Sequence, residues 1–357
     1  MERTPIQRAC GRQTRIAFTL VELLVVITII GILAALITAA GAGALKRAQQ
    51  ARIKTEVDQL AMALQTYKDT AGSYPPNCQT DGTSDPINEI QVLTDLKRAF
   101  RQAFPRHREP EALIAALAGL APDGTQLPTG QNLQGGMTSG EALVFWLGGF
   151  SSDPKYPISG EGGPSYRIDN LTSPANADNA DPIESRKWVY PFELARLQPR
   201  NADKYFDKSE NRFIVYNVNV GGVNQQRRIN FWQYVPAKSE KPLLYFDTSR
   251  HEPETAFDPP AATGLSASPL HVHAVKSRSQ SAGAALAIQF ANRDKFQVLH
   301  CGIDEEWGEA EFEKMTLHGS PPPTANDLLL YPDGPFTGEV ADTITNFSEG
   351  TLEASQP

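Results

Sequence analysis

The sequence has few cysteines, little positive charge and only one long hydrophobic run. Three cysteines in 357 residues are too few for a disulfide scaffold. The 33 lysine and arginine residues are outnumbered by 41 aspartate and glutamate residues, which gives a formal net charge of −8. A protein that binds nucleic acid needs a basic face to neutralise the phosphates. We therefore expect no nucleic acid as primary partner.

Sequence motifs for catalysis are also missing. The chain has no nucleophile elbow, no phosphate-binding glycine loop, no quartet of metal ligands and no convincing acid–base pair. His271 and His273 would share one face of a strand, but no third ligand follows at a metal-binding spacing. The glutamates between residues 305 and 313 are best interpreted as a solvated face. We therefore do not expect an enzyme.

The one long apolar run covers residues 23–45, where no charged side chain occurs. At about 1.5 Å per helical residue it extends roughly 35 Å, enough to cross a hydrocarbon core of about 30 Å. Glu22 stands just before the run. Since a carboxylate at this position is costly unless it is paired, Glu22 is a candidate functional residue. The simpler alternative is that Glu22 snorkels to the headgroups of an ordinary anchor.

Two other interpretations of this N-terminus are a plain single-pass anchor and a long signal peptide cleaved among residues 39–42. Charge does not decide the orientation, because Arg12 and Arg15 precede the run while Lys46 and Arg47 follow it. The residues around the start of the run are more informative than the charges.

The sequence AFTLVE at residues 17–22 resembles the cleavage and methylation signature of type IV prepilins and type II secretion major pseudopilins. The resemblance implies that prepilin peptidase removes a basic leader, residues 1–17, between Ala17 and Phe18 and methylates the new N-terminus at Phe18. The family usually has glycine before the cut, where this chain has Ala17. In a filament, Glu22 would then pair with the Phe18 amine of a neighbouring subunit and stay charged in an apolar bundle.

The helix is expected to continue beyond the membrane. We divide it into a transmembrane part, residues 18–45, and an amphipathic part, residues 46–71. Apolar residues in the second part recur at three- and four-residue steps, with charged residues including Glu56 elsewhere on the circumference. Gly72 is expected to end the helix and residues 73–77 to form a loop. The sequence AGSYPPN at residues 71–77 again resembles major pseudopilins.

Residues 72–240 are interpreted as a loop and a large inserted region. Helices are expected at 87–103, 109–120 and 141–147, strands at 187–190 and 213–220, and irregular surface at 153–181. Trp146 and Trp188 are expected to pack in the core rather than to stack on a ligand.

Residues 241–357 are interpreted as a C-terminal β-sheet region with a closing loop. Strands are expected at 241–249 and 295–301, and an excursion loop at 252–283. The sequences EALVFWLGGF and PLLYFDT resemble a large-insert subgroup of prepilin-like proteins.

The closing loop also resembles that of major pseudopilins, in which it binds calcium. On this resemblance Asp342 matches the second aspartate of a pair, Ala341 replaces the first, and Asn346 and Phe347 match the residues that follow. Asp333, Asp304 or Glu339 would have to complete the ligand set. The alternative is a solvated acidic loop held by turn hydrogen bonds. Apart from calcium, no cofactor is expected. Cys78 and Cys301 both follow the apolar run and could form a disulfide if this part of the chain is exported.

The predicted fold is α+β and pilin-like: a long N-terminal helix packed on a small antiparallel sheet, with a large irregular α/β insertion. The expected function is a structural subunit of a type IV pilus-like or type II secretion pseudopilus filament. The implied partners are prepilin peptidase, other pilin-like subunits, the inner-membrane assembly machinery and the lipid bilayer. We expect a single-pass protein of the inner membrane with a cytoplasmic N-terminus. The alternative is a membrane-anchored extracytoplasmic binding module that uses the pilin signal only for export and anchoring.

Overall fold

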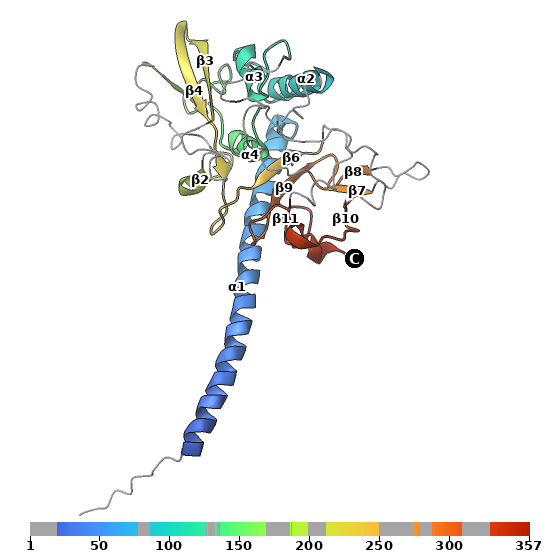
Figure 1. Ribbon diagram of the computed structural model, residues 1–357. Helices are drawn as coiled ribbons and strands as arrows, with labels where there is room; N and C mark the ends of the chain where they lie inside the picture. Colours follow the sequence, from blue (N-terminus) through green and yellow to red (C-terminus); the bar gives the residue numbers. More distant parts are fainter. Residues whose placement is uncertain are drawn as a thin grey trace, which may run out of the picture. The chain divides into compact units, whose positions relative to one another are not determined.

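The computed structural model describes residues 20–77, 86–125, 127, 133, 136–168, 186, 188–198, 212–249, 274–278, 288–308 and 329–357. The chain divides into two compact units, Met1–Ala48 and Gln49–Pro357. The fold is an α+β mixture with one long N-terminal helix and several small sheets, as predicted (Figure 1).

The helices are α1 (Leu20–Ala71), α2 (Pro86–Ala103), α3 (Glu111–Leu117) and α4 (Ser139–Leu147). The strands are β1 (Ser165–Arg167), β2 (Leu197–Gln198), β3 (Phe213–Val220), β4 (Val223–Asn230), β5 (Gln233–Tyr234), β6 (Leu244–Asp247), β7 (Lys276–Arg278), β8 (Ile288–Phe290), β9 (Phe296–His300), β10 (Leu330–Tyr331) and β11 (Ile344–Thr345). Three 3-10 helices lie at Leu194–Arg196, Gly338–Val340 and Glu353–Ser355.

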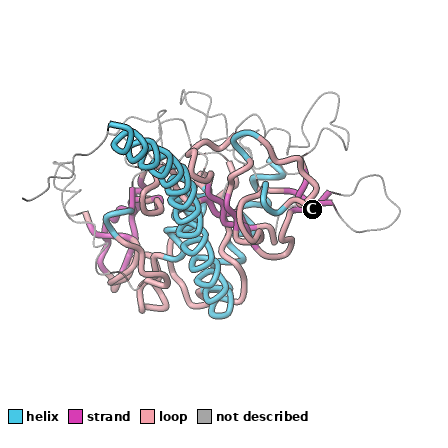
Figure 2. The backbone as a smooth tube through the Cα atoms, turned by 90° about the horizontal axis from the view of Figure 1, so that it is seen from below, coloured by secondary structure: helices cyan, strands magenta, loops and turns pink. Residues whose placement is uncertain are grey.

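The strands form three three-stranded sheets, β1-β4-β3, β10-β7-β8 and β11-β9-β6, and a two-stranded sheet, β2-β5. Every pair is antiparallel except β10 with β7, which is parallel. Figure 2 shows that loops occupy much of the space between these short strands. The second unit is therefore held together by its core more than by long hydrogen-bond ladders.

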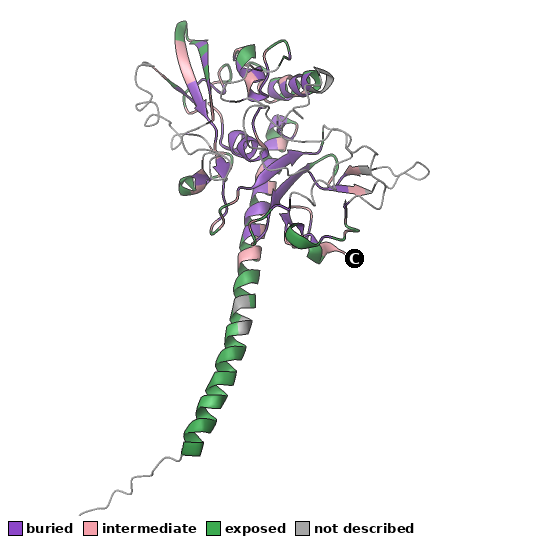
Figure 3. Cartoon of the chain, in the orientation of Figure 1, coloured by how far each residue is buried: buried purple, intermediate pink, exposed green. Residues whose placement is uncertain are grey.

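The first part of α1 exposes nearly every large apolar side chain it carries. Exposure between Leu20 and Ile37 ranges from 45% at Val26 to 80% at Leu20 (Figure 3). Among the described residues, α1 is the one helix that is long and apolar enough to cross a membrane.

The second part of α1 is amphipathic, as predicted. Ile53, Val57, Leu60 and Leu64 are all fully buried. They share one core with aromatic and aliphatic side chains of the β11-β9-β6 sheet, including Val298. The expectation for Glu56 is wrong: it lies on the buried side of the helix, with its side chain only 10% exposed, because a cation from the insertion reaches it there.

The predicted end of α1 is confirmed. Gly72 adopts a φ of 84°, and its N–H donates to the carbonyl of Lys68 at 2.7 Å. The following loop is buried rather than solvated. The indole N–H of Trp146 donates to the Pro76 carbonyl at 2.8 Å, and the Tyr245 hydroxyl donates to the Pro75 carbonyl at 2.6 Å. The loop thus joins α1 to α4 and β6.

The insertion contains the three predicted helices and strand β3. The second expected helix, 109–120, is shorter and forms α3. The predicted strand at 187–190 is wrong: the N–H groups of Val189 and Tyr190 both donate to the carbonyl of Leu147 at the end of α4. Trp146 is fully buried, and Trp188 packs half-buried against the same core.

Two segments expected to be irregular contain strands. β1 lies within residues 153–181, where Ile158, Ser159 and Ser165 are buried rather than at the surface. β7 lies within residues 252–283. Both strands are only three residues long. β1 pairs with the long strand β4, and β7 lies between the short strands β10 and β8, and local periodicity indicates neither pairing. His271 and His273 lie outside the described residues.

The predicted strands of the C-terminal region are confirmed as β6 and β9, which pair antiparallel. The other face of these two strands packs against the C-terminal segment in a separate core. This second core includes Phe246, Leu299, Trp307, Phe336 and Leu352.

Candidate functional site

Glu22 is the one acidic residue in the first turn of α1, and it is exposed. A negative charge in the first turn of a helix is favourable because unpaired backbone N–H groups lie there. Ala17 and Phe18, the predicted cleavage pair, lie outside the described residues. Their proposed roles, and that of Glu22 in assembly, stay predictions.

The rest of the first part of α1 is suited to a hydrocarbon environment. Its apolar side chains are exposed all around the helix, so no single face is reserved for a soluble core. The hydroxyls of Thr28 and Thr38 donate to the carbonyls of Val25 and Ala34, at 2.7 and 2.8 Å. The two threonine hydroxyls are thus satisfied within the helix, as a bilayer requires of polar groups.

Two contacts connect the second part of α1 to distant parts of the chain. Arg196 places one guanidinium nitrogen 2.8 Å from both carboxylate oxygens of Glu56. Its guanidinium also lies 4.9 Å from the ring centre of Tyr234. Lys54 donates to Asp58 at 2.7 Å and to the carbonyl of Thr345 at 3.0 Å. The insertion and the closing loop are therefore both fastened to the same helix by charged side chains.

The closing loop is fastened to the end of β9 through Asp342. One carboxylate oxygen of Asp342 accepts the N–H of Ile303 at 2.8 Å. This approach requires glycine at position 302, which has a φ of 101°. A Cβ atom there would lie 2.3 Å from the Asp342 carboxyl carbon. The family resemblance at this motif thus has a structural explanation that needs no metal.

Asn346 extends this attachment. Its side-chain carbonyl accepts the N–H of Val298 at 2.8 Å, and its own N–H donates to the Val298 carbonyl at 3.2 Å. Phe347 packs its ring 5.1 Å from that of Tyr331. The predicted Asn-aromatic pair therefore completes the sheet after the two residues of β11.

Asp304 and Asp342, two of the predicted calcium ligands, lie close together. Burial, together with the neighbouring charges of Asp342 and Glu339, raises the pKa of Asp304 to about 6. Among the described residues, however, no group of three or more His, Cys, Asp and Glu side chains is arranged to hold a metal ion. Since calcium also takes backbone carbonyls and water, calcium binding by Asp304, Asp333 and Asp342 stays a prediction. An unchanged thermal midpoint in chelator would contradict it.

The disulfide also stays a prediction. Cys301 is a free, buried thiol in the second core, and burial raises its pKa well above the usual value. Cys78 lies outside the described residues.

A buried polar network in the insertion escaped the sequence analysis. The carboxylate of Glu109 accepts the N–H groups of Ile158 and Ser159 at 2.8 and 2.7 Å and the Ser159 hydroxyl at 2.5 Å. That hydroxyl lies 2.7 Å from the hydroxyl of Tyr216. Burial raises the pKa of Glu109 and raises that of Tyr216 to about 12. The network joins Glu109, two residues before α3, to β3, and the carboxylate of Glu109 accepts three hydrogen bonds.

Comparison with known proteins bears on the N-terminus. Residues 13–38 match the family model of the prokaryotic N-terminal methylation motif. No curated protein and no solved structure matches the chain. The motif indicates a prepilin-like protein whose N-terminus is processed, and it contains Ala17, Phe18 and Glu22. The predicted resemblance to prepilins is thereby confirmed, and one apolar helix after the motif fits a single-pass membrane anchor.

Proposed function

We propose that this chain is a structural subunit of a type IV pilus-like or type II secretion pseudopilus filament. Prepilin peptidase removes residues 1–17 and methylates Phe18, and the processed chain assembles through the first part of α1. The proposal is supported by the methylation motif at residues 13–38 together with the apolar helix that follows it.

The exposed apolar surface of α1 carries the argument for assembly. Side chains from Leu20 to Ile37 need an apolar neighbour on every side of the helix. Lipid supplies it before assembly, and the same segments of other subunits supply it in a filament, where helices pack through van der Waals contacts. The protein therefore resides in the inner membrane, with its N-terminus cytoplasmic, until the assembly machinery extracts it.

Glu22 sets the register of this packing. Between residues 20 and 45 it is the only charged side chain. Cleavage before Phe18 creates a cationic amine close to the same depth in every subunit. A carboxylate buried in a helix bundle is retained when a cation pairs with it, so Glu22 of one subunit receives the Phe18 amine of the next.

Processing and assembly can be tested separately. Mass spectrometry of the mature chain should find an N-terminus at Phe18 that carries one added methyl group. A chain that still begins at Met1, or one that begins after residue 39, would contradict the proposed processing.

For assembly, Glu22→Gln removes the charge and keeps the size, while Glu22→Asp keeps the charge. Both variants should be cleaved normally. Glu22→Gln should fail to enter sheared filaments or cross-linked assemblies, and Glu22→Asp should enter in part. Normal incorporation of Glu22→Gln would reject the filament mechanism and favour a membrane-anchored binding module.

A further inference from the structure

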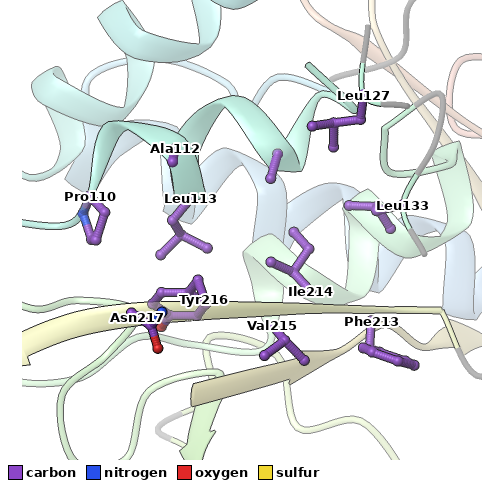
Figure 4. Close-up of a pocket in the computed structure, with 11 residues that line it drawn as sticks. Pro110, Ala112, Leu113, Leu127, Leu133, Phe213, Ile214, Val215, Tyr216 and Asn217 are labelled. Carbon is purple, nitrogen blue, oxygen red and sulfur yellow. The ribbon is translucent and has the colours of Figure 1, made fainter. Parts of the chain in front are cut away.

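An apolar groove of about 400 Å³ lies between α3 and β3 (Figure 4). Leu113 and Ala116 of α3 form one wall, Ile214 and Val215 of β3 form the other, and Leu133 closes one end. None of the residues that line it is charged, although the chain carries a net charge of −8. The groove thus excludes a charged occupant, which would lose its hydration without gaining a partner.

The groove runs along the edge of a sheet. In the order β1-β4-β3, the described strands pair with only one side of β3. The register pairs Asn217 with Gln226, whose carbonyl accepts the N–H of Ile168 on the β1 side. The backbone groups of Gln226 therefore point away from β3. By the alternation of antiparallel ladders, those of Asn217 and Val215 point outward on the opposite side, along the groove.

These outward backbone groups have no partner in the described part of the chain. No hydrogen bond there reaches the N–H or carbonyl of Val215 or Asn217. Farther along the same edge, the carbonyl of Asn219 already accepts the hydroxyl of Tyr156 at 2.7 Å. The free stretch therefore covers about five residues, from Phe213 to Asn217, which is the length of an ordinary strand.

This edge lacks the usual protection against pairing. Exposed edge strands normally carry a lysine, a proline or a bulge. The hairpin of β3 and β4 has no charged residue from position 213 to position 226 and no proline. Its eight strand pairs run without interruption from Phe213 opposite Asn230 to Val220 opposite Val223. An unpaired edge with an apolar groove beside it is the arrangement that binds an added strand.

A second copy of β3 does not suit this groove. The β3 side chains that face α3 are those of Ile214, Tyr216 and Val218, which are 7%, 9% and 5% exposed. They are already packed in the core of their own chain. An occupant has to bring apolar side chains that are free before binding, as an extended segment of a different protein does.

We propose that the groove between α3 and β3 binds an extended, uncharged polypeptide strand of another protein. The strand pairs its backbone with Val215 and Asn217, and its alternate apolar side chains contact Ala112 and Ala116 of α3. The proposal concerns the second unit alone and holds whether or not the chain forms filaments.

The test uses the full chain in detergent micelles and a fluorescent uncharged peptide with blocked ends, Asn-Thr-Val-Thr-Leu-Thr-Val-Asn, whose binding is followed by anisotropy. Val215→Pro removes an outward N–H at the groove and leaves the ladder to β4 intact. Asn224→Pro is the matched control, because Asn224 lies opposite Asn219 and faces away from the groove. Ala116→Arg places a charge in the groove without altering the strand.

We expect saturable binding to the natural chain, at least tenfold weaker binding to Val215→Pro and Ala116→Arg, and a change below twofold for Asn224→Pro. Circular dichroism and thermal melting check that each variant is folded, and Ala116→Arg decides the matter if Val215→Pro is not. Absence of binding to the natural chain, or equal loss in both proline variants, would overturn the proposal. So would self-association that Val215→Pro abolishes, since it would assign the edge to a second copy.

Discussion

The two parts of α1 contain similar apolar residues in opposite surroundings. Leu33 is 52% exposed, whereas Leu60 is fully buried. The first part is apolar on all sides, and the second alternates buried and exposed positions with a helical period. One uninterrupted helix thus has a first part suited to lipid and a second part suited to packing on a folded unit. The distribution of apolar residues around its axis shows where the first part ends and the second begins.

The glutamates of the two parts differ in the same way. Glu56 is buried and receives its cation, Arg196, from 140 residues farther along the same chain. Glu22, in the proposed filament, receives its cation from another subunit. A carboxylate on an apolar helix therefore indicates a partner, and whether that partner is intramolecular depends on which part of the helix carries it.

The largest difference between the two parts of α1 is expected when a charge is introduced into the first part. Ile30→Arg places a guanidinium in the middle of the apolar run, at a cost of about 3 kcal/mol for membrane insertion. The variant should be lost from carbonate-washed membranes, while the thermal midpoint of the folded unit stays unchanged. Ile30→Leu is the control. A lowered midpoint for Ile30→Arg would show that the first part stabilises the folded unit.

The reverse effect is expected from a cavity in the second part. Leu60→Ala should lower the free energy of unfolding by about 2 to 5 kcal/mol, measured in urea, because the surrounding core is closed. Membrane retention should not change. Met62→Ala, at a position 64% exposed, should change the free energy by less than about 0.5 kcal/mol. Equal effects of the two variants would contradict the assigned faces of the helix.

A smaller effect is expected from the buried ion pair. Glu56→Ala removes the more buried of the two carboxylates that pair with Arg196 and should cost about 2 kcal/mol, less than loss of a fully buried pair because Arg196 remains 21% exposed. Glu193 also pairs with Arg196, at 2.7 Å, but its side chain is 62% exposed. Glu193→Ala should therefore cost less than about 0.5 kcal/mol. Equal costs would mean that burial does not distinguish the two pairs.

The smallest effect concerns pH and only the second unit. Gly302 donates its N–H to Nδ1 of His300 at 3.0 Å, which leaves the ring proton on Nε2, 3.0 Å from the Ser239 hydroxyl. Burial lowers the pKa of His300 to about 4. Because the unfolded chain takes up this proton near pH 6.5 and the folded chain does not, stability should fall as pH drops from about 6.5 to 4.

The His300→Gln variant isolates that dependence. Asp304, whose pKa is raised, acts in the opposite direction between about pH 4 and 6, and it contributes to both proteins. Relative to its own value at pH 7, the variant should therefore be more acid-tolerant than the natural chain, by on the order of 1 kcal/mol at pH 5. Parallel pH profiles of the two midpoints would contradict the neutral state of the buried imidazole.

Local patterns were sufficient for the long elements. The periodicity of residues 53–64, the glycine at position 72 and the alternation in β3 each have one strong local cause, and the structure confirms them. The strand expected at 187–190 failed because its backbone pairs with the end of α4, an outcome that depends on the tertiary fold.

The polar attachments could not be predicted, because each joins residues far apart in sequence. Glu109 meets Ser159 across 50 residues, and Lys54 meets the carbonyl of Thr345 across 291. The only sequence signal for such an attachment is a charged residue beside residues expected to be buried, as Glu56 is beside Val57. The methylation motif is different, because it lies entirely in consecutive residues, 13–38, and is recognisable without the fold.

The buried loop after Gly72 fixes the point at which the insertion begins. The carbonyls of Pro75 and Pro76 are each held by an aromatic donor, one from β6 and one from α4. The departure point of the insertion is thereby fixed on both sides. Helices α2 and α3 then pack Leu96, Phe100 and Leu113 into the same core as α1, so only the exposed positions between Asn77 and α4 are free to change. The fold thus offers a fixed starting point from which new surface can evolve.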